Sequence, residues 1–466
     1  MSGPGAAGPR SIHMVGIGGA GMSGLALLAR SAGYRVGGTD RDDSPMLSAL
    51  RDAGVDARAG HGADAVAADA QALVVSTAIS PDNPELAEAR RRGLPVLHRS
   101  QLLAELMAGR RGLAVAGAHG KSTTSAMLLA ALGDASACVG ATIAGGRGTG
   151  AVWGAGSWFV AEADESDRSL LNLAPEAAIL LNVDHDHHAT YATLDEVREV
   201  FRAFVARLPG DGVLVVGPDE DARACAAGAP CAVRLVGEGP DAFCRVERVP
   251  GAVGFDLVLA DGHRVAVPLP LAGRHMAENA ACALALADWC GVPLEEAAAR
   301  LEGFTGVGRR MEHRGTAAGV EVVDDYAHHP AEIRATLAAA RERGPGRVVV
   351  VFQPHLPSRT RALGAELAEA LGAADVAVVT DVYLAREPAD PVVTGRSVAD
   401  RVPPPARAVF AATLSEAADA VMADVRPGDL VITMGAGDVT GLGKELVARL
   451  ERLSGDGDRD PRTDPA

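Results

Sequence analysis

Several features that mark other protein classes are missing from this sequence. It has no run of roughly 18 or more apolar residues, and its start, MSGPGAAGPR, lacks the apolar core of a signal peptide. Its six cysteines include no C-x-x-C pair, which disfavours a zinc site and a disulfide framework. A net charge of −16 disfavours a nucleic-acid-binding face. We therefore expect a cytoplasmic protein without membrane insertion and without nucleic acid as a partner.

Lysine is almost absent as well. Of the 44 basic residues only Lys121 and Lys444 are lysine, so arginine serves wherever any positive charge suffices. An ammonium is a compact point charge that fits between phosphate oxygens, whereas a planar guanidinium does not suit such a loop. Because Gly120 and Ser122 flank it, Lys121 is a candidate phosphate ligand.

What is present indicates a globular α/β protein. The chain has 466 residues, 48% hydrophobic and 22% charged, enough for about two to four domains with cores of their own. In the first third, strand-like segments at 11–18, 34–40 and 71–79 alternate with a helix-like segment at 21–33. This alternation predicts βαβ units and a parallel sheet.

A glycine-rich turn follows the first expected strand. Gly16, Gly18 and Gly21 form a G-x-G-x-x-G pattern, and Asp40 ends the second strand. Such glycines let the amides at a helix N-terminus approach a diphosphate, and the aspartate can accept hydrogen bonds from a ribose or base. By itself the pattern is typical of an NAD site, although close helix packing also explains it.

A second turn of this kind is AGAHGKSTT, residues 116–124, between a strand-like run at 113–117 and a helix-like run at 123–132. It is shorter than the P-loop pattern G-x-x-x-x-G-K-[ST]. It nevertheless keeps the order strand, turn, Gly-Lys-Ser and helix, which presents backbone N–H groups and a helix dipole to phosphate. We predict an ATP site here, with Ser122 as a magnesium ligand.

Two further expected strands end in side chains that can bind metal. The segment WFVAEADESD (158–167) places Glu162 at a strand end, and residues 177–191 run from a strand into Asp184, His185, Asp186, His187 and His188. The carboxyl ends of strands in an open α/β sheet form the ligand crevice, so these groups are expected near the phosphate loop. Zinc on His185, His187 and His188 is an alternative, but the hard oxygen donors nearby favour magnesium.

In order along the chain, the motifs GIGGAGMSG, AGAHGKSTT, EADESD, LNVDHDHHATY, GRHMAENA, GVGRRMEHRG, VVDDYAHHP, FQPHLPSRT and GAGD resemble those of the Mur ligases of peptidoglycan synthesis. The resemblance covers nearly all of residues 11–450. It implies an α/β protein of three domains: a Rossmann-like UDP-sugar-binding domain (1–108), a P-loop-type ATPase with a mostly parallel sheet (109–313) and a Rossmann-like amino-acid-binding domain (314–452). Residues 453–466 are expected to be a disordered tail.

The resemblance also assigns ligands to individual residues. It places the diphosphate of a UDP-sugar, rather than NAD, on the first glycine turn. Lys121 is expected to contact the β and γ phosphates. The sets it implies are, for UDP-sugar, Gly18, Gly19, Ala20, Gly21, Met22, Asp40 and Ser76; for ATP, Gly117, Ala118, His119, Gly120, Lys121, Ser122, Thr123, Asn279, Arg309 or Arg310, and Asp325; and for magnesium, Ser122, Glu162 and His187.

For the amino acid, the resemblance implies Tyr326, His328 and Arg359, with the guanidinium of Arg359 gripping the carboxylate. The amine that attacks must lose a proton, and His187 and His328 are both candidates for the base. Lys121, His187 and His328 are thus the expected catalytic residues.

Four positions depart from the family pattern. Ala118 replaces a threonine of the loop, Met276 replaces the first asparagine of H-N-x-x-N, and Leu356 replaces an arginine that often follows Q-P-H. Residues 188–210 contain no lysine, so the carbamylated lysine of several sister ligases is absent, as in the branch that adds L-alanine.

The resemblance therefore implies an ATP- and Mg²⁺-dependent ligase that joins L-alanine to the lactyl carboxylate of UDP-N-acetylmuramate through an acyl phosphate. A ligase that attaches a recycled peptide to the same sugar is the nearest alternative, followed by an NAD-dependent oxidoreductase and by a module that uses ATP only to switch conformation. We expect a monomer or a weak homodimer.

Overall fold

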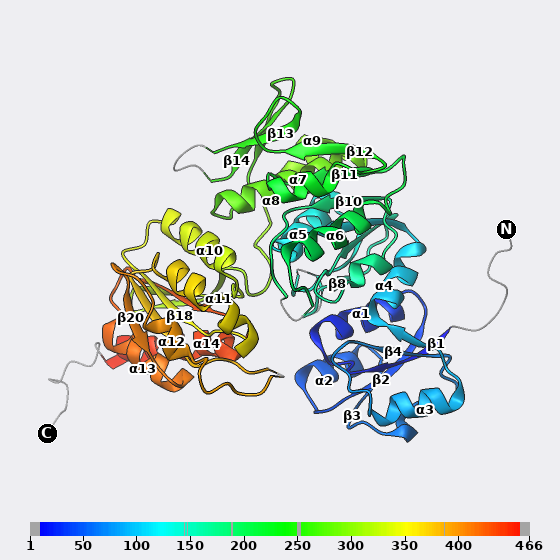
Figure 1. Cartoon of the computed structure of the whole chain (residues 1–466), viewed down its shortest axis with the longest axis horizontal. Helices are drawn as coiled ribbons and strands as arrows, with labels where there is room; N and C mark the ends of the chain where they lie inside the picture. The colour runs from blue at the N-terminus through cyan, green and yellow to red at the C-terminus, as the bar shows by residue number, and fades with distance from the viewer. Residues whose placement is uncertain are drawn as a thin grey trace, which may run out of the picture.

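The computed structural model describes residues 10–143, 145–146, 148–187, 190–248, 253–385 and 387–456. Within these ranges the strands form three sheets. Figure 1 shows each sheet with its helices as a separate body, with the first and the last both beside the middle one. We call them the N-terminal module (β1 to α4), the central module (β6 to α9) and the C-terminal module (β16 to α14).

The N-terminal module is a sheet of order β3-β2-β1-β4-β5 in which each neighbouring pair is parallel. Its central strand β1 is buried along its whole length because helices cover both faces of the sheet. The strands are β1 (Ser11–Val15), β2 (Arg35–Asp40), β3 (Asp56–Ala59), β4 (Ala72–Val75) and β5 (Val96–His98), and the helices are α1 (Ala20–Ser31), α2 (Pro45–Asp52), η1 (Ala63–Ala65), α3 (Pro84–Arg92) and α4 (Arg99–Ala108).

The central module is a larger sheet of order β15-β14-β13-β12-β11-β10-β6-β9-β7-β8. Neighbouring strands from β13 to β7 are parallel, and the β13–β14, β14–β15 and β7–β8 pairs are antiparallel. The strands are β6 (Arg111–Ala116), β7 (Ser136–Cys138), β8 (Ala151–Val152), β9 (Trp158–Glu162), β10 (Ala177–Leu180), β11 (Val213–Val216), β12 (Ala232–Val236), β13 (Ala242–Glu247), β14 (Phe255–Leu259) and β15 (Arg264–Val267), and the helices are α5 (Lys121–Leu132), η2 (Ser169–Asn172), α6 (Leu194–Val205), α7 (Glu220–Ala226), α8 (Arg274–Trp289) and α9 (Leu294–Ala299).

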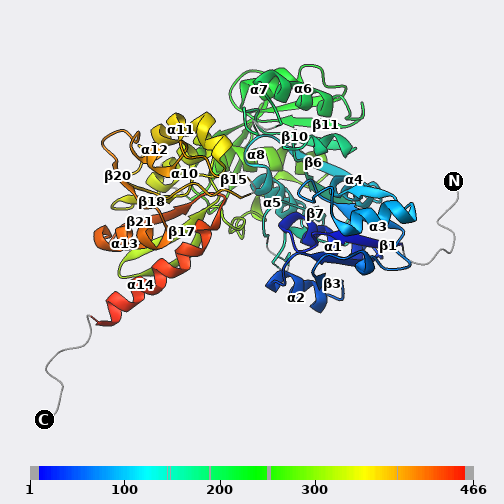
Figure 2. The ribbon, with the colours of Figure 1, turned by 60° about the horizontal axis from the view of Figure 1, so that its bottom comes forward.

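The C-terminal module has the sheet order β16-β17-β21-β18-β19-β20, and only the β16–β17 pair among these strands is antiparallel. Figure 2 shows α14 extending from the outer side of this module. The strands are β16 (Glu312–Ala317), β17 (Val320–Asp325), β18 (Val348–Phe352), β19 (Val376–Val379), β20 (Arg407–Phe410) and β21 (Leu430–Met434), and the helices are α10 (Pro330–Glu342), α11 (Pro357–Leu371), α12 (Gly395–Ala399), α13 (Leu414–Asp424), η3 (Asp438–Gly441) and α14 (Leu442–Asp456).

Two ends of elements bear on the expected domain limits. Strand β16 begins at Glu312, before the division expected after residue 313. Helix α14 continues to Asp456, so its last turn lies within the expected disordered tail, and residues 457–466 lie outside the described part of the chain. No helix in the described ranges is both long enough and apolar enough to cross a membrane.

The N-terminal and central modules share an apolar core, whereas the C-terminal module has separate ones. One continuous cluster joins the N-terminal module to a face of the central sheet, and it includes Leu25 and Leu102 from one side and Phe159 and Leu170 from the other. The C-terminal module instead has apolar clusters of its own on the two faces of its sheet. Polar contacts join it to the central module, such as the hydrogen bonds from Arg248 to Glu342 and from Arg359 to Asp186. The C-terminal module is therefore attached chiefly by charge.

Inside the N-terminal module, helix α3 is tied to the sheet by a buried carboxylate. Glu85 is 0% exposed. Its Oε2 lies 2.7 Å from His13 Nε2 of β1, both its oxygens accept from Thr39 Oγ1 of β2, and its Oε1 lies 2.9 Å from His61 Nδ1. Burial would raise the pKa of Glu85, but these hydrogen bonds outweigh it and hold the pKa below its ordinary value.

We expect Glu85→Gln to destabilise the protein by about 1–3 kcal/mol at pH 7, because buried donors lose a charged acceptor. A carboxylate with a lowered pKa contributes stability above its ordinary pKa and loses that contribution as the pH falls through the pKa of the folded state. The difference between the two proteins should therefore shrink in acid. Urea unfolding followed by circular dichroism at pH 7 and pH 4 measures it.

The matched control is Glu88→Gln, on the same helix, where the carboxylate pairs with Arg91 at the surface. It should leave the unfolding free energy nearly unchanged, because an exposed ion pair contributes little to stability. Equal losses in the two variants, or a loss in Glu85→Gln that grows in acid, would contradict the assignment.

Candidate active site

The turn between β6 and α5 has the shape expected of a phosphate loop. Buried strand β6 ends at Ala116, and α5 begins at Lys121. Gly117 and Gly120 have φ angles of 142° and 84°, values that side-chain-bearing residues rarely adopt. The Lys121 ammonium donates back to the carbonyl oxygens of Gly117 (2.7 Å) and Ala118 (3.1 Å). The lysine is thus folded over the turn from which its helix starts.

The resting partner of Lys121 is Glu165, which the sequence analysis quoted but did not select. Lys121 Nζ lies 2.8 Å from Glu165 Oε2 and 3.0 Å from its Oε1, and Glu165 is 2% exposed. Burial alone would lower the pKa of Lys121, but Glu165, Glu162 and Asp164 raise it. The lysine therefore stays charged. The signal that identifies Glu165 in the sequence is the second glutamate of EADESD.

Two of the expected magnesium ligands adjoin each other. Ser122 Oγ donates to Glu162 Oε2 at 2.9 Å, and that oxygen also accepts from the backbone of Gly140. His187, the third, lies 3.4 Å from Glu165 Oε1 through its Nε2. A hydroxyl and carboxylates are the hard donors that Mg²⁺ prefers, so the residues present fit this ion.

The zinc alternative receives no support at His185. Its Nε2 lies 3.2 Å from the carbonyl oxygen of Tyr191, a backbone group rather than another histidine. His188 lies outside the described residues.

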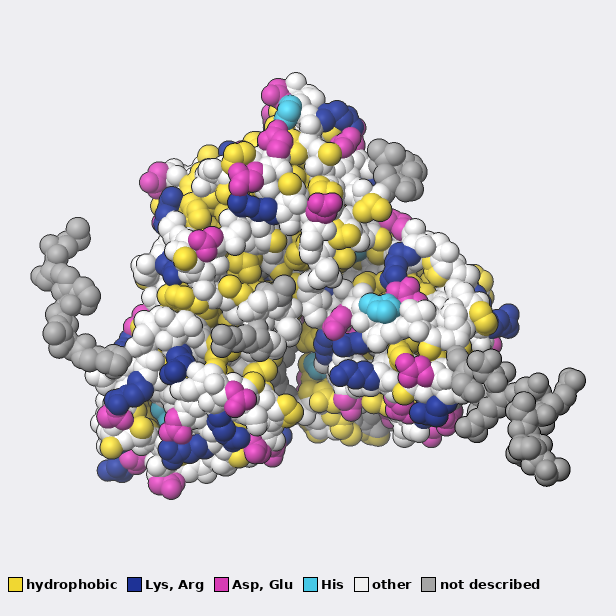
Figure 3. Space-filling model, turned by 180° about the vertical axis from the view of Figure 1, so that it is seen from behind, with side chains coloured by type: hydrophobic (Ala, Val, Ile, Leu, Met, Phe, Trp, Pro, Cys, Tyr) yellow, Lys and Arg dark blue, Asp and Glu magenta, His cyan; other side chains and the backbone are white. Residues whose placement is uncertain are grey.

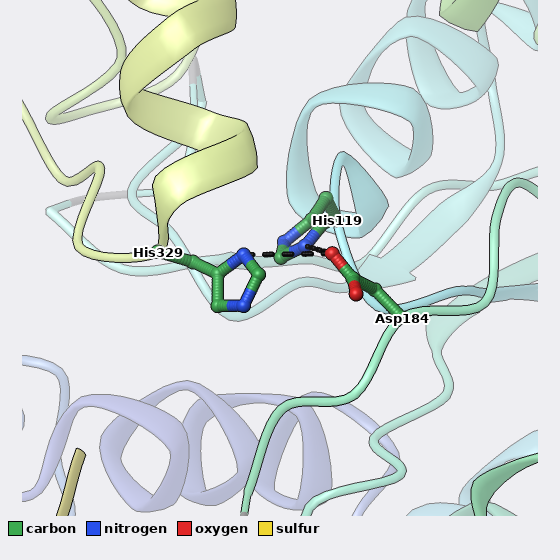
Figure 4. Close-up of side chains that lie close together, drawn as sticks. All are labelled: His119, Asp184 and His329. Atoms are coloured by element: carbon green, nitrogen blue, oxygen red, sulfur yellow. Dashed lines mark hydrogen bonds and ion pairs between the residues drawn. The ribbon is translucent and has the colours of Figure 1, made fainter. Parts of the chain in front are cut away.

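The loop reaches the C-terminal module through a histidine pair (Figure 4). His119 Nε2 lies 3.1 Å from Asp184 Oδ2, and His329 Nδ1, at the start of α10, lies 3.5 Å from the same oxygen. Burial would lower the pKa of His119, but Asp184 and Glu332 raise it to about 9. This trio is close enough to hold a cation, but the proton favoured on His119 makes an ion pair with Asp184 of the same module. Across the modules, His119 Nδ1 lies 3.7 Å from Glu332 Oε1 of α10.

A cavity of about 710 Å³ lies between the central and C-terminal modules. Of the residues expected to bind ATP, those that line it are His119, Gly120, Thr123, Asn279, Arg310 and Asp325. The Asn279 amide packs against the loop, since a Cβ on Gly120 would stand 3.0 Å from its Nδ2. Residues far apart in the sequence are thus brought to one volume. Met276, one of the departures from the family pattern, also lines it.

The structure distinguishes the two arginines that the sequence left open. Arg310 lines the cavity and pairs with Glu332 at 3.2 Å. Arg309 is bound inside the C-terminal module, where it pairs with the buried Asp324 at 3.1 Å and donates to the carbonyl of Gly435. Arg310 is therefore the one placed to meet a ligand in the cavity.

The side chains expected to contact the amino acid form a second group, beside Asp186 of the central module. Arg359 Nη2 lies 2.7 Å from Asp186 Oδ1 and its Nη1 lies 3.3 Å from His355 Nδ1. Tyr326 and His328 meet edge to face, with ring centroids 5.1 Å apart. Burial lowers the pKa of His328 to about 4, so its imidazole is neutral near pH 7.

The first glycine turn lies in the N-terminal module. The Asp40 carboxylate lies against this turn. Its Oδ2 accepts from the backbone N–H of Gly18 at 2.8 Å, and its Oδ1 accepts from the backbone N–H of Arg41. Asp40 thus holds the turn in shape. The sequence analysis missed Arg99, whose guanidinium lies 3.5 Å from where a Cβ on Gly21 would stand.

Other members of the expected sugar-binding set surround this turn. Gly19 caps the N-terminus of α1, which begins at Ala20, and Ser76 directly follows β4. Arg99 also pairs with Asp164 of the central module at 2.7 Å. The turn is therefore connected to the carboxylates around Lys121. Leu356, another departure, precedes α11 with a φ of 69°, and its N–H donates to the carbonyl of Tyr383.

The two glycine turns and the strand ends that follow them lie in the same order as in a known family. The chain matches "Mur ligase family, catalytic domain" over residues 11–111, "Mur ligase middle domain" over 115–287 and "Mur ligase, glutamate ligase domain" over 309–437. These stretches correspond in turn to the three modules.

Individual proteins agree with these matches. The chain is 45% identical over 450 residues to a UDP-N-acetylmuramate–L-alanine ligase of Streptomyces coelicolor (94% of this chain, 97% of that protein) and 48% identical over 455 residues to one of Kineococcus radiotolerans (94% and 95%). The crystal structure of the UDP-N-acetylmuramate-alanine ligase MurC of Thermotoga maritima superposes with a TM-score of 0.79 at 27% identity, over 95% of this chain and 99% of that one. The expected three-part α/β fold is confirmed, and because motifs, modules and whole-chain similarity coincide, the chain belongs to the Mur ligase family.

Proposed function

We propose that this protein joins L-alanine to the lactyl carboxylate of UDP-N-acetylmuramate, at the expense of ATP, in the cytoplasmic synthesis of peptidoglycan precursors. The observation that carries the proposal is the cavity between the central and C-terminal modules, where the phosphate loop faces Arg310 and Asp325 and the Asp186–Arg359 pair joins the same two modules. The names of the Streptomyces and Kineococcus relatives support the choice of substrates.

The chemistry follows from the need to activate a carboxylate, which is a poor acyl donor. The γ-phosphoryl group of ATP is transferred to the lactyl carboxylate to give an acyl phosphate. The amine of L-alanine then attacks, and phosphate leaves. Lys121, which now pairs with Glu165, exchanges that carboxylate for phosphate oxygens. Ser122, Glu162 and His187 would hold magnesium, which when bound would supply positive charge beside the phosphoryl group.

The polar attachment of the C-terminal module serves this chemistry. An acyl phosphate hydrolyses if water reaches it, so the site must close when the substrates are in place. Ion pairs such as His119–Glu332 and Asp186–Arg359 join the two modules. Substrates also carry charged groups, and these can compete with the side chains of the ion pairs. Binding of charged substrates can therefore shift the C-terminal module from one position to another relative to the central module.

His328 and His187 are both candidates for the base. Burial lowers the pKa of His328 to about 4, so its imidazole is neutral near pH 7 but accepts a proton only weakly, since a general base works best when its pKa lies near the working pH. His187, the other candidate, is expected to hold magnesium, which occupies its lone pair.

The function is tested by phosphate release with UDP-N-acetylmuramate and ATP across the twenty amino acids and a muramyl-type tripeptide. We expect release to depend on L-alanine, and Lys121→Ala to reduce it about 100- to 1,000-fold without loss of fold, because the transferring phosphoryl loses its fixed cation. Lys444→Ala, the only other lysine, lies exposed on α14 and should behave as wild type. Release that depends on the tripeptide alone, or full activity in Lys121→Ala, would refute the proposal.

Gly120→Ala should weaken binding of an ATP analogue. A side chain at a φ of 84° costs roughly 1–2 kcal/mol and pushes the Asn279 amide away from the loop. Calorimetry should show a loss in affinity of about tenfold or more. The control is Gly133→Ala at the other end of α5, where φ is 82° and the side chain would meet only Arg300. If both variants bind the analogue equally well, the loop is not the nucleotide site.

Arg359→Ala should raise the KM for L-alanine by about 10- to 100-fold and leave the KM for ATP nearly unchanged, because a charged bidentate contact to the amino acid is lost. Arg361→Ala is the matched control, since that arginine is exposed and pairs with Asp390. A uniform rise in both KM values would count against the assigned role.

A further inference from the structure

The contact between Asp186 and Arg359 is the most buried ion pair that joins two modules. Arg359 is 7% exposed and Asp186 is 6% exposed. Asp186 Oδ1 accepts from Arg359 Nη2 at 2.7 Å and from its Nε at 3.3 Å. Asp186 belongs to the loop after β10 of the central module, and Arg359 lies in the first turn of α11 of the C-terminal module.

Arg359 gives Asp186 its charged partner, since two N–H groups of the guanidinium donate to one oxygen of the carboxylate. A buried charge that loses its partner costs several kcal/mol. A ligand that bears only a carboxylate would free Arg359 from Asp186 and leave Asp186 unpaired. A ligand that separates the pair without this cost must bring one charge of each sign.

The two ends of the pair face different surroundings. On the arginine side lies His355, 3.3 Å from Arg359. On the aspartate side, Asp186 Oδ2 lies 3.8 Å from His187 Nε2, which in turn lies 3.4 Å from Glu165, the partner of Lys121. Asp186 therefore marks the end of the pair that is nearer to the phosphate loop.

We propose that Asp186 and Arg359 are the two halves of a clamp for the zwitterionic amino acid: its carboxylate binds Arg359 and its ammonium group binds Asp186. This rests on the proposed function, and it adds Asp186 to the residues that select the substrate. The orientation follows from the surroundings, since the nitrogen that attacks the acyl group is turned toward Lys121 and its carboxylates. Without substrate, Asp186 and Arg359 neutralise each other. The amino acid binds between them and replaces each residue's partner with a charged group of its own.

The clamp predicts that Asp186→Asn changes the affinities for two ligands in opposite directions. In Asp186→Asn, L-alanine loses its ammonium partner and should bind about tenfold or more weakly. Propionate, which has the same carbon chain and carboxylate but no ammonium group, no longer has to displace a charged competitor from Arg359. It should bind several-fold more tightly to the variant than to the wild type. A purely structural role for Asp186 would weaken both ligands.

The experiment is calorimetric titration of the full-length protein, saturated with UDP-N-acetylmuramate, a non-hydrolysable ATP analogue and Mg²⁺, with L-alanine, propionate and ethylamine. Asp221→Asn is the matched control, because Asp221 also pairs with an arginine, Arg198, but does so within the central module and away from the site. It should leave both affinities unchanged. Asp186→Glu keeps the charge and should retain the preference for L-alanine over propionate.

Two results would overturn the clamp: a change of the same sign for L-alanine and propionate in Asp186→Asn, or wild-type protein that binds propionate or ethylamine as tightly as L-alanine. The second comparison needs no variant and so decides the matter even if Asp186→Asn does not fold. Failure of the proposed function would be recognised separately, as wild-type protein that releases no phosphate with L-alanine.

Discussion

A lysine ammonium buried at the end of β6 sets the requirements for everything around it. Lys121 cannot stay charged among apolar strands without compensation, and Glu162, Asp164 and Glu165, at and just after the end of β9, supply it. These carboxylates carry the negative charge that a nucleotide would otherwise bring. In the proposed reaction, ATP would take the place of Glu165 at Lys121, and Glu165 would keep its contact with His187, 3.4 Å away.

The same principle of exchange operates between the modules. The N-terminal and central modules share one apolar core, which does not respond to ligand charge. The C-terminal module is joined by buried and half-buried ion pairs, whose strength depends on every charge that enters the cavity. Figure 3 shows charged side chains of both signs interspersed on the face opposite to that of Figure 1, with a hollow between the lower two bodies. Polar attachment is thus a means of coupling closure to the presence of substrates.

Site residues could be predicted from the sequence where their motif lies in consecutive residues, and not where their partners lie far away along the chain. The turn with Gly117 to Ser122 and the strand end at Glu162 were predicted because strand, turn and helix are written in consecutive residues. Asn279, Arg310 and Asp325 came from family resemblance, and the structure places all three on one cavity. Glu165, Arg99 and the bond between Asp186 and Arg359 were missed, because partners between 44 and 173 positions apart leave no local pattern. Asp40 was predicted to bind the UDP-sugar, and the structure adds that it accepts from the backbone N–H of Gly18 in the turn beside it.

The sequence by itself determined the class of fold, the order of its three parts and the choice of Lys121 as the candidate phosphate ligand, because hydrophobic period, glycine placement and the scarcity of lysine are properties of the chain read in order. Only the tertiary structure decided which charges neutralise one another: that Lys121 rests on Glu165, that Arg310 rather than Arg309 faces the cavity, and that Asp186 occupies Arg359. The reason is physical, since the energy of an ion pair depends on separation and burial in space, and neither is recorded in the spacing of residues along the chain.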